Sequence, residues 1–415
     1  MIQKDLSTSN YKYNFIAFIW HALFLALMKP FLDTDTIIPA MIIKSGGKEV
    51  IIGLVTAILV GFSTLFQFFF GSFLSHRQNK KFHLLFAIYL RVFSIVGLGA
   101  LFFFYNLLST FAALALIIFF IGVFSIAGAY GGVSYTDLVG KSVLPESRKS
   151  LFSLKNLIGA LAFLVAAFFA KKILKFYEFP KNYTYLYLIA GLLLFIASIG
   201  FIALKEKRTK LLEKKSFVDF IKLLPKELKG NKNLLYFVIV LNTFGLSITS
   251  FPFLVSYAKT AGHFTSESVG NFLMMKMAGI VLFSLFVFVF KNKINYRNIL
   301  TISVIAGAAL PILALFTVNT AIIYGINFFV AGSIFALFRI AKEGIVIEIS
   351  NEQNRVIYAG IVGAGSIFTA ILPLFSGFFI SQFGYKAVFI AVSVIVLSSL
   401  YFVLKLDCSN VSNID

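Results

Sequence analysis

Long apolar runs that carry almost no charge follow one another along the whole chain, separated by short polar gaps. A helix needs ~20 largely apolar residues to cross the hydrocarbon core of a bilayer. Only α-helices and closed β-barrels satisfy their backbone groups in lipid, and these runs lack the alternation of polar and apolar residues that barrel strands show. The runs therefore predict an all-α polytopic membrane protein with twelve transmembrane helices, or ten or eleven if a weak run such as 321–343 is re-entrant. We place the spans at residues 13–30, 50–74, 82–105, 107–131, 150–170, 183–204, 234–258, 267–290, 296–317, 321–343, 358–380 and 385–404.

The overall composition argues against a water-soluble protein. Of the residues, 59% are hydrophobic and 13% are charged, whereas soluble domains carry roughly 25% charged and 45–50% apolar residues. The formal net charge of +20 could suggest a nucleic acid partner, but ten of the 37 basic residues lie between Lys205 and Lys232, and most others lie in short gaps between apolar runs. That distribution follows the positive-inside bias of membrane proteins, so we expect no nucleic acid partner.

Residues suited to metal binding or catalysis are few. Cys408 is the only cysteine, and the four histidines are scattered along the chain, none with another histidine or cysteine at i+3 or i+4. We therefore expect no disulfide, no metal site and no cofactor. An intramembrane enzyme would need paired carboxylates, a Ser/His set or a metal cluster at one depth, and a channel would need a filter-like repeat or a charged ring. Neither pattern is present, so we expect no catalytic residues and predict that the protein is not an enzyme.

One long polar stretch divides the chain into two halves of six spans each. We expect a six-helix bundle over 1–204, a basic cytoplasmic linker over 205–232 and a second six-helix bundle over 233–415. The linker is either a solvated connection or, in part, an amphipathic helix on the inner leaflet. Basic residues concentrate in the segments that are internal if the N-terminus is cytoplasmic. Both termini are therefore expected in the cytoplasm, in a multi-pass protein of the cell membrane, with the bacterial inner membrane as its location.

The two halves share a weak internal repeat of the kind found in transporter folds. Arg148 lies in the loop after the fourth span, 11 residues beyond Asp137, and Arg355 lies in the loop after the tenth, 12 residues beyond Glu343. In each half the loop is followed by an apolar run that contains glycine. The two halves therefore read as copies of one six-span unit.

The loop between the second and third spans adds a short motif to this layout. It begins at Gly71 and continues through Arg77 and Lys80. Together with the two six-span halves, it resembles the major facilitator superfamily over nearly the whole chain. The family's motif places an acid four residues after the glycine, where this chain has Ser75, and its second glycine is absent. The glycine–proline signature of the drug antiporters is absent from 150–170, which argues against that subgroup.

The resemblance implies secondary active transport by alternating access, in which two bundles move around a central site lined by spans one, four, seven and ten. The implied partners are a small-molecule substrate, a coupling ion such as a proton or sodium, and membrane lipids. The protein is expected to be a monomer.

Charged residues at the inner ends of the spans suggest gates. Asp137 would pair with Arg77 or Lys80, and Glu343 with Lys291, Lys293 or Arg297, and each pair would hold the inner side closed. The alternative is that these are interfacial charges in water, where an exposed ion pair contributes only ~0–1 kcal/mol. The residues assigned to gating are Gly71, Arg77, Lys80, Asp137, Arg148, Glu343 and Arg355.

Two cations lie deep inside their spans. Arg91 and Lys276 are about nine residues from a span end, which is ~13 Å at 1.5 Å per residue, whereas Lys29, Lys155, Arg339 and Lys342 lie near enough to an end to reach the interface. The acids near the spans are expected only at the inner ends, so the deep cations would be uncompensated and would favour an organic anion as substrate. The alternative is that one of them pairs with backbone carbonyls or borders the seam between the bundles.

Polar and aromatic residues on two spans complete the candidate substrate site. Trp20, His21 and Phe24 share a face of the first span, and Asn242 and Thr243 lie on the seventh. Packing and helix–helix hydrogen bonding are the competing interpretations. We expect a secondary active transporter of a small solute, an organic anion, with a lipid or amphiphile flippase or exporter of the same fold as the alternative. The residues assigned to substrate binding are Lys276, Arg91, Trp20, His21, Phe24, Asn242 and Thr243.

Overall fold

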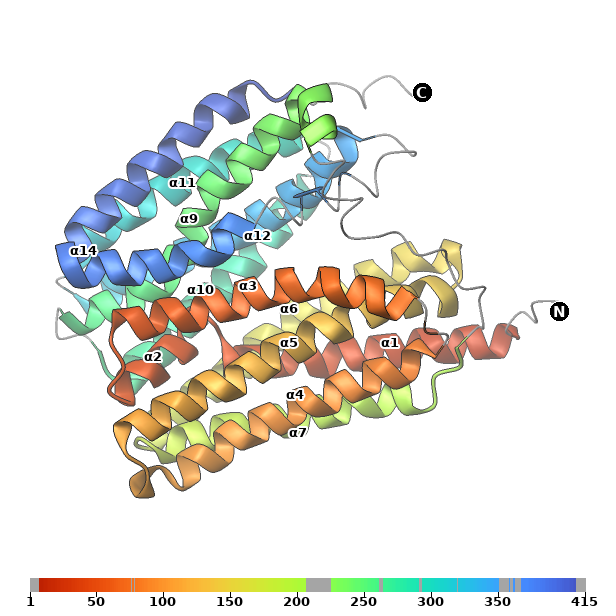
Figure 1. Cartoon of the computed structure of the whole chain (residues 1–415), viewed down its shortest axis with the longest axis horizontal. Coiled ribbons are helices and arrows are strands. Elements are labelled where there is room, and N and C mark those ends of the chain that lie inside the picture. The colour runs from red at the N-terminus through yellow and green to blue at the C-terminus, as the bar shows by residue number, and fades with distance from the viewer. Residues whose placement is uncertain are drawn as a thin grey trace. The chain divides into compact units, whose positions relative to one another are not determined.

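The computed structural model describes residues 7–75, 77, 79–206, 225–260, 264–290, 293–318, 320–350, 358, 361–362 and 367–407, and these residues are almost entirely helical (Figure 1). The main elements are α1 (Thr8–Met28), the 3-10 helix η1 (Lys29–Leu32), α2 (Ile37–Lys44), α3 (Glu49–Ser75), α4 (Lys80–Phe103), η2 (Tyr105–Leu107), α5 (Thr110–Ser142), α6 (Pro145–Phe176), α7 (Lys181–Ile202), α9 (Lys232–Thr260), α10 (Ser266–Val289), α11 (Tyr296–Thr317), α12 (Ala321–Glu348) and α14 (Ile367–Leu404).

Ten segments of the described residues are long and apolar enough to cross a membrane. One of them, Ser9–Lys44, runs through α1, η1 and α2. Helix α6 is a further long helix of 32 residues, and Gly384, with φ 76° and ψ 168°, interrupts α14. The all-α polytopic fold predicted from the sequence is therefore confirmed, with a helix count close to the predicted twelve.

Several helices extend beyond the apolar runs that predicted them. Helix α5 continues to Ser142, although its apolar run was expected to end at residue 131, and α6 ends at Phe176 and not at residue 170. An apolar run reports only the part of a helix that lies in hydrocarbon, whereas caps and prolines set the ends. Pro145 provides the start of α6, because a proline in the first turn loses no helical hydrogen bond.

The chain divides into two compact units. Unit 1 comprises Met1–Asp33 and Ile58–Asp219, and unit 2 comprises Thr34–Ala57 and Phe220–Asp415. Residues 34–57 therefore pack with the second half of the chain, although the expected division placed all of 1–204 in the first bundle. This strap, as we call residues 34–57, contains α2 and the first residues of α3.

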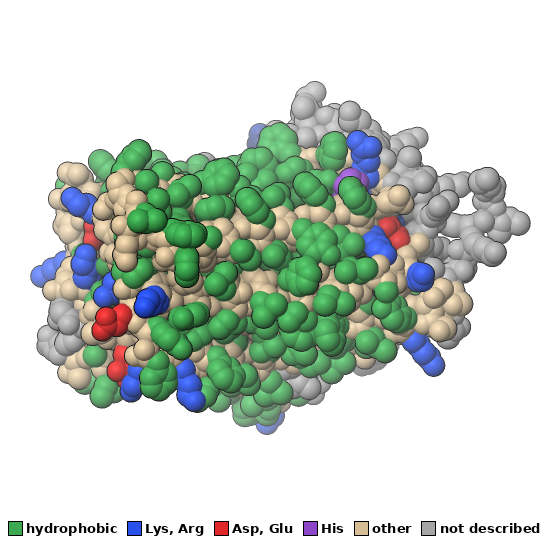
Figure 2. Space-filling view, turned by 90° about the horizontal axis from the view of Figure 1, so that it is seen from below, with side chains coloured by type: hydrophobic (Ala, Val, Ile, Leu, Met, Phe, Trp, Pro, Cys, Tyr) green, Lys and Arg blue, Asp and Glu red, His purple; other side chains and the backbone are tan. Residues whose placement is uncertain are grey.

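Unit 1 packs α1 against α6 and α7, and α4 against α5 and α7. On α4, the side chains of Phe82, Phe86, Tyr89 and Phe93 recur at helical spacing and are all exposed. Figure 2 shows one face of the molecule on which hydrophobic side chains cover the middle of the surface, while lysine and arginine side chains gather toward its two ends. Exposed aromatic stripes of this kind are the lipid-facing surface of a membrane helix.

Unit 2 packs α10 against α12, α9 against α14, and α11 against both α12 and α14. Glycines allow the closest approaches. A Cβ atom added to Gly53 of α3 would lie 2.3 Å from the carbonyl oxygen of Pro373 in α14, and one added to Gly377 would lie 2.5 Å from the carbonyl oxygen of Glu49. The strap is thus in backbone contact with α14, an arrangement that small residues make possible in membrane helices.

Candidate functional site

The first membrane span, Ser9–Lys44, is broken in its last third. Helix α1 passes into η1 at Lys29, the chain is not helical from Asp33 to Thr36, and α2 then resumes at Ile37. Asp33, Asp35 and Thr36 are all buried. Irregular backbone at membrane depth is tolerated only where it is buried in protein or lines a wet cavity. Discontinuous helices of this kind hold substrate and ion sites in many transporters.

A buried ion pair joins this break to α10. The Nζ atom of Lys276 on α10 lies 2.5 Å from Oδ2 of Asp35, and the two residues are only 4% and 8% exposed. Thr34 donates a hydrogen bond of 3.2 Å from its hydroxyl to Oδ1 of Asp35. Both partners of the ion pair belong to unit 2.

The expectation that Lys276 is an uncompensated charge is therefore wrong. The first span was expected to end at residue 30, which placed Asp35 outside the membrane and left it out of the candidate residues. Seven further buried residues, from Ile37 to Ile43, follow the acid. This second apolar run was the signal that the span continues past Asp35.

The backbone around Lys276 is held closely against α12. A Cβ atom added to Gly332 would lie 2.0 Å from the carbonyl oxygen of Lys276, and one added to Gly279 would lie 2.2 Å from that of Phe329. Helix α10 begins with a capping box in which Thr265 and Ser268 exchange hydrogen bonds of 2.8 and 3.0 Å. Lys276 is thus presented from a tightly packed and well-capped helix.

A second polar cluster connects the strap to α9 and α14. Oε1 of Glu49 accepts hydrogen bonds from the hydroxyls of Tyr385, at 2.8 Å, and Ser256, at 3.2 Å. The two hydroxyl oxygens lie 2.5 Å apart. Glu49 is in the first turn of α3, where the helix dipole favours a negative charge. The strap is therefore attached to unit 2 by two carboxylates, Asp35 and Glu49.

Arg91 lies within unit 1, on α4, and stacks on an aromatic ring. Its Cζ atom is 4.3 Å from the ring centroid of Phe124. A Cβ atom added to Gly128 would lie 3.8 Å from Nε of Arg91, so this glycine leaves room for the guanidinium. The Nε atom is buried and has no hydrogen-bond partner among the described residues. The ring stabilises the positive charge through a cation–π interaction. The N–H group at Nε remains available to donate a hydrogen bond to an anion.

The first-span residues Trp20 and His21 contact the backbone of α7. Trp20 donates a hydrogen bond of 2.9 Å from Nε1 to the carbonyl oxygen of Ile196, and Nδ1 of His21 lies 3.2 Å from that of Ala197. The Trp20 ring is 4.7 Å from the ring of Phe24. These contacts join α1 to α7 within unit 1.

The polar residues on α9 bond to their own helix or to a neighbouring one. Asn242 donates to the carbonyl oxygen of Val238 at 2.8 Å, and Thr243 to that of Ile239 at 2.9 Å. Both side chains are half-buried. The nearby Ser247 donates instead to Gly307 of α11, at 2.9 Å.

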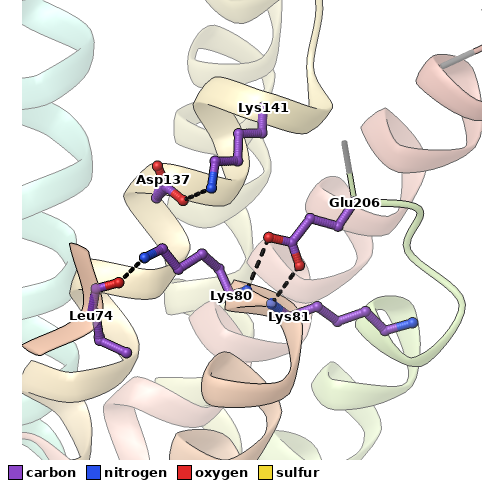
Figure 3. A network of polar contacts seen from close by, with 6 residues as sticks. All are labelled: Leu74, Lys80, Lys81, Asp137, Lys141 and Glu206. Carbon is purple, nitrogen blue, oxygen red and sulfur yellow. Dashed lines mark hydrogen bonds and ion pairs between the residues drawn. The ribbon is translucent and has the colours of Figure 1, made fainter. Parts of the chain in front are cut away.

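Charged residues at one end of unit 1 form the network shown in Figure 3. Asp137 pairs with Lys141, one turn later on α5, at 2.5 Å, and not with Arg77 or Lys80. Lys80 directs its ammonium group to the carbonyl oxygen of Leu74. The carboxylate of Glu206, which was not among the predicted residues, accepts the backbone N–H groups of Lys80 and Lys81, both at 2.9 Å. Glu206 therefore caps the N-terminus of α4.

The remaining predicted gating residues have separate surroundings. Arg148 donates to the carbonyl oxygens of Gly140, at 2.7 Å, and Val143, at 3.3 Å, at the C-terminus of α5. Arg77 lies with Cζ 5.2 Å from the ring centroid of Phe73.

The other three gating candidates are Gly71, Glu343 and Arg355. Gly71 is inside α3, and Glu343 is exposed on α12. Arg297, an expected partner of Glu343, donates to the carbonyl oxygen of Leu404 at 2.6 Å. Arg355 and Lys291 lie outside the described residues.

No protein-family model and no curated protein matches the sequence. Solved structures match it over almost its full length. A mutant of the nucleoside transporter NupG has a TM-score of 0.70 at 14% identity, with 96% of this chain and 99% of that chain covered. A POT family transporter in complex with 5-aminolevulinic acid has a TM-score of 0.69 at 12% identity, with 95% of each chain covered. A D-xylose-proton symporter has a TM-score of 0.69 at 10% identity, with 95% of this chain and 98% of that chain covered.

The chain has the major facilitator fold. Its long apolar helices and this fold make it a multi-pass membrane protein. The neighbours with the major facilitator fold named above are membrane transporters. At 10–14% identity they establish the architecture only.

Proposed function

We propose that the chain is a secondary active transporter that moves a small organic anion across the cell membrane by alternating access. The coarse part of this proposal is supported by the transporter fold and by neighbours that carry nucleosides or sugars according to their names. The finer part, an anionic substrate, rests on the cation at Arg91.

The observation that carries the anion proposal is the environment of this one guanidinium. Arg91 lies in the middle of a membrane-spanning helix, stacked on Phe124 and without an ion-pair partner among the described residues. A charge at this depth costs about 2.5–3.5 kcal/mol on insertion scales, so it is rarely kept without a function. A guanidinium binds a carboxylate or phosphate through paired N–H donors, which makes such a group its best substrate partner.

The other predicted substrate residues are proposed to act with Arg91 in different ways. Lys276 provides a second cation, on unit 2. Trp20, His21 and Phe24 on α1, and Asn242 and Thr243 on α9, are proposed to contact the substrate. The coupling ion is proposed to be a proton or sodium. The residues proposed to serve the gates are Gly71, Arg77, Lys80, Asp137, Arg148, Glu343 and Arg355, of which Lys80 and Asp137 are drawn in Figure 3.

Uptake into proteoliposomes tests the proposal. The purified protein is reconstituted and supplied with radiolabelled organic anions, a neutral sugar and an organic cation, with and without an imposed proton or sodium gradient. We expect gradient-driven uptake of an anion, reduced at least about tenfold by Arg91→Gln and less by Arg91→Lys, because lysine keeps the charge but not the paired donors. Arg339→Gln is the matched control, since Arg339 is exposed on α12.

Several outcomes would contradict the proposal. Uptake only of the sugar or the cation would remove the anion assignment, as would equal uptake by the wild type and Arg91→Gln. Movement of a labelled phospholipid between leaflets, without uptake of any small solute, would favour the flippase alternative.

A further inference from the structure

The two partners of the buried ion pair in unit 2 are held very differently. Lys276 is on α10, whose backbone is in contact with α12 at both Gly279 and Gly332. There is no space at this crossing for even one added carbon atom, so the backbone position of Lys276 is fixed. Its long side chain ends at the break in the first span.

Asp35, in contrast, is in the middle of that break. The backbone is extended at Asp33, with φ −59° and ψ 125°, and Thr36 has φ −127° and ψ −61°. Residues between two helical pieces can change φ and ψ without breaking a run of helical hydrogen bonds, which is how hinges absorb motion. The carboxylate is therefore on a non-helical segment between two helices, and the ammonium is on a helix that is tightly packed at Lys276 itself.

We infer that Asp35 is a built-in counter-ion which occupies Lys276 in the absence of substrate, and that an anionic group of the transported solute replaces it there. The inference rests on the proposed function and adds to it a residue that sets specificity. The ligand class follows from what it replaces: a small anion with an accessible carboxylate, phosphate or sulfate group. A neutral or cationic solute does not replace the negative charge that Asp35 places beside the buried ammonium.

Replacement of Asp35 by a substrate anion explains why the buried Lys276 is paired with a carboxylate that lies at a helix break. A lysine buried in protein without any anion would be strongly disfavoured. A carboxylate on a rigid helix would satisfy it permanently and close the site. A carboxylate at a helix break satisfies it only until a ligand of the same charge competes for the ammonium.

Binding measurements on four proteins test the inference. Thermal unfolding of the full-length chain in detergent is followed against increasing phosphate, sulfate and succinate, with xylose as a neutral probe, for wild type, Asp35→Asn, Lys276→Gln and Glu49→Gln. A ligand that binds the folded state raises the unfolding temperature according to its Kd.

Removal of the competitor is expected to tighten anion binding. If the pair is closed in about nine-tenths of wild-type molecules, Asp35→Asn lowers the apparent Kd of the best anion about tenfold, because the apparent Kd scales inversely with the competent fraction. Lys276→Gln raises that Kd at least about tenfold. Glu49→Gln is the matched control, a carboxylate of the same strap bonded to hydroxyls of Ser256 and Tyr385, and should leave the Kd unchanged.

Unchanged or weaker anion binding in folded Asp35→Asn would overturn the inference, and so would unchanged binding in Lys276→Gln. If Asp35→Asn does not fold, the double variant Asp35→Asn/Lys276→Gln, which removes both charges of the pair, replaces it. If added anion no longer raises the unfolding temperature of the double variant, the inference is supported. If added anion still raises it, the inference is overturned. Anion uptake with an unchanged Kd in Asp35→Asn would overturn the exchange alone, whereas tighter binding without any uptake would overturn the proposed transport function.

Discussion

At the scale of single residues, the ion pair of Asp35 and Lys276 is central to both the stability of unit 2 and the inferred anion binding. Each is buried, and their charged atoms lie 2.5 Å apart. Removing one member of a buried ion pair leaves an uncompensated charge, which costs about 3–5 kcal/mol, whereas removing both is often nearly neutral. Replacing either residue alone should therefore lower the free energy of unfolding more than replacing both together.

We predict that, without added anion, Asp35→Asn and Lys276→Gln each lower the free energy of unfolding by about 3–5 kcal/mol. The double variant Asp35→Asn/Lys276→Gln should recover most of that loss. A double-mutant cycle from denaturant or thermal unfolding in detergent measures the coupling. Additive losses, with the double variant less stable than either single variant, would show that the two charges are not coupled.

At the scale of elements, the crossing of α10 and α12 fixes the position of Lys276. The two glycines at this crossing face a backbone carbonyl oxygen of the opposite helix at separations that no real Cβ atom could keep. In contrast, the would-be Cβ of Gly140 on α5 meets no atom of the described residues within 4 Å, apart from those of its own stretch of helix. Substitution by alanine should therefore lower stability at the tightly packed glycines and should not lower it at Gly140.

We predict that Gly332→Ala destabilises the protein by about 1–3 kcal/mol, because the added methyl group must push α10 and α12 apart. Gly140→Ala should be neutral or stabilising by up to about 1 kcal/mol, because it only restricts the unfolded chain. Unfolding temperatures of the two variants under the same conditions provide the measurement. A Gly332→Ala variant as stable as Gly140→Ala would contradict the close approach.

The positions of the helices were largely predictable from the sequence. The long-range contacts between their side chains were not. Lipid is a uniform solvent, so a run such as 234–258 has to be apolar whatever it packs against, and α9 accordingly covers it. The pairing of Asp35 with Lys276 depends on a contact between residues 241 positions apart. No local pattern encodes such a contact, and the cap that Glu206 provides for α4 is hidden for the same reason.

At the scale of the whole molecule, the distribution of basic residues predicts one topology. Cys408 is the only cysteine and lies outside the described residues, close to the C-terminus. With both termini cytoplasmic, a membrane-impermeant thiol reagent should label it in lysed cells but not in intact ones. Labelling of Cys408 in intact cells, with an extracellular cysteine variant as the positive control, would contradict the positive-inside assignment.

The division into units also differs from a division of the sequence into halves. The polar stretch 205–232 is visible in the sequence and separates two sets of six predicted spans. The strap Thr34–Ala57 crosses this division, because its carboxylates Asp35 and Glu49 find their partners on α9, α10 and α14. The composition of the sequence reveals the polar linker between the halves. It does not reveal that one segment of the first half packs with the second.

The strap also has a consequence for biosynthesis. A ribosome makes Asp35 early, and Lys276 follows 241 residues later. At ~5–20 residues per second, the carboxylate waits about ten to fifty seconds for its ammonium partner. During that interval Asp35 cannot yet pair with Lys276, and α2 cannot yet pack against α9 and α10. The strap therefore completes its packing only after the second half of the chain has been made.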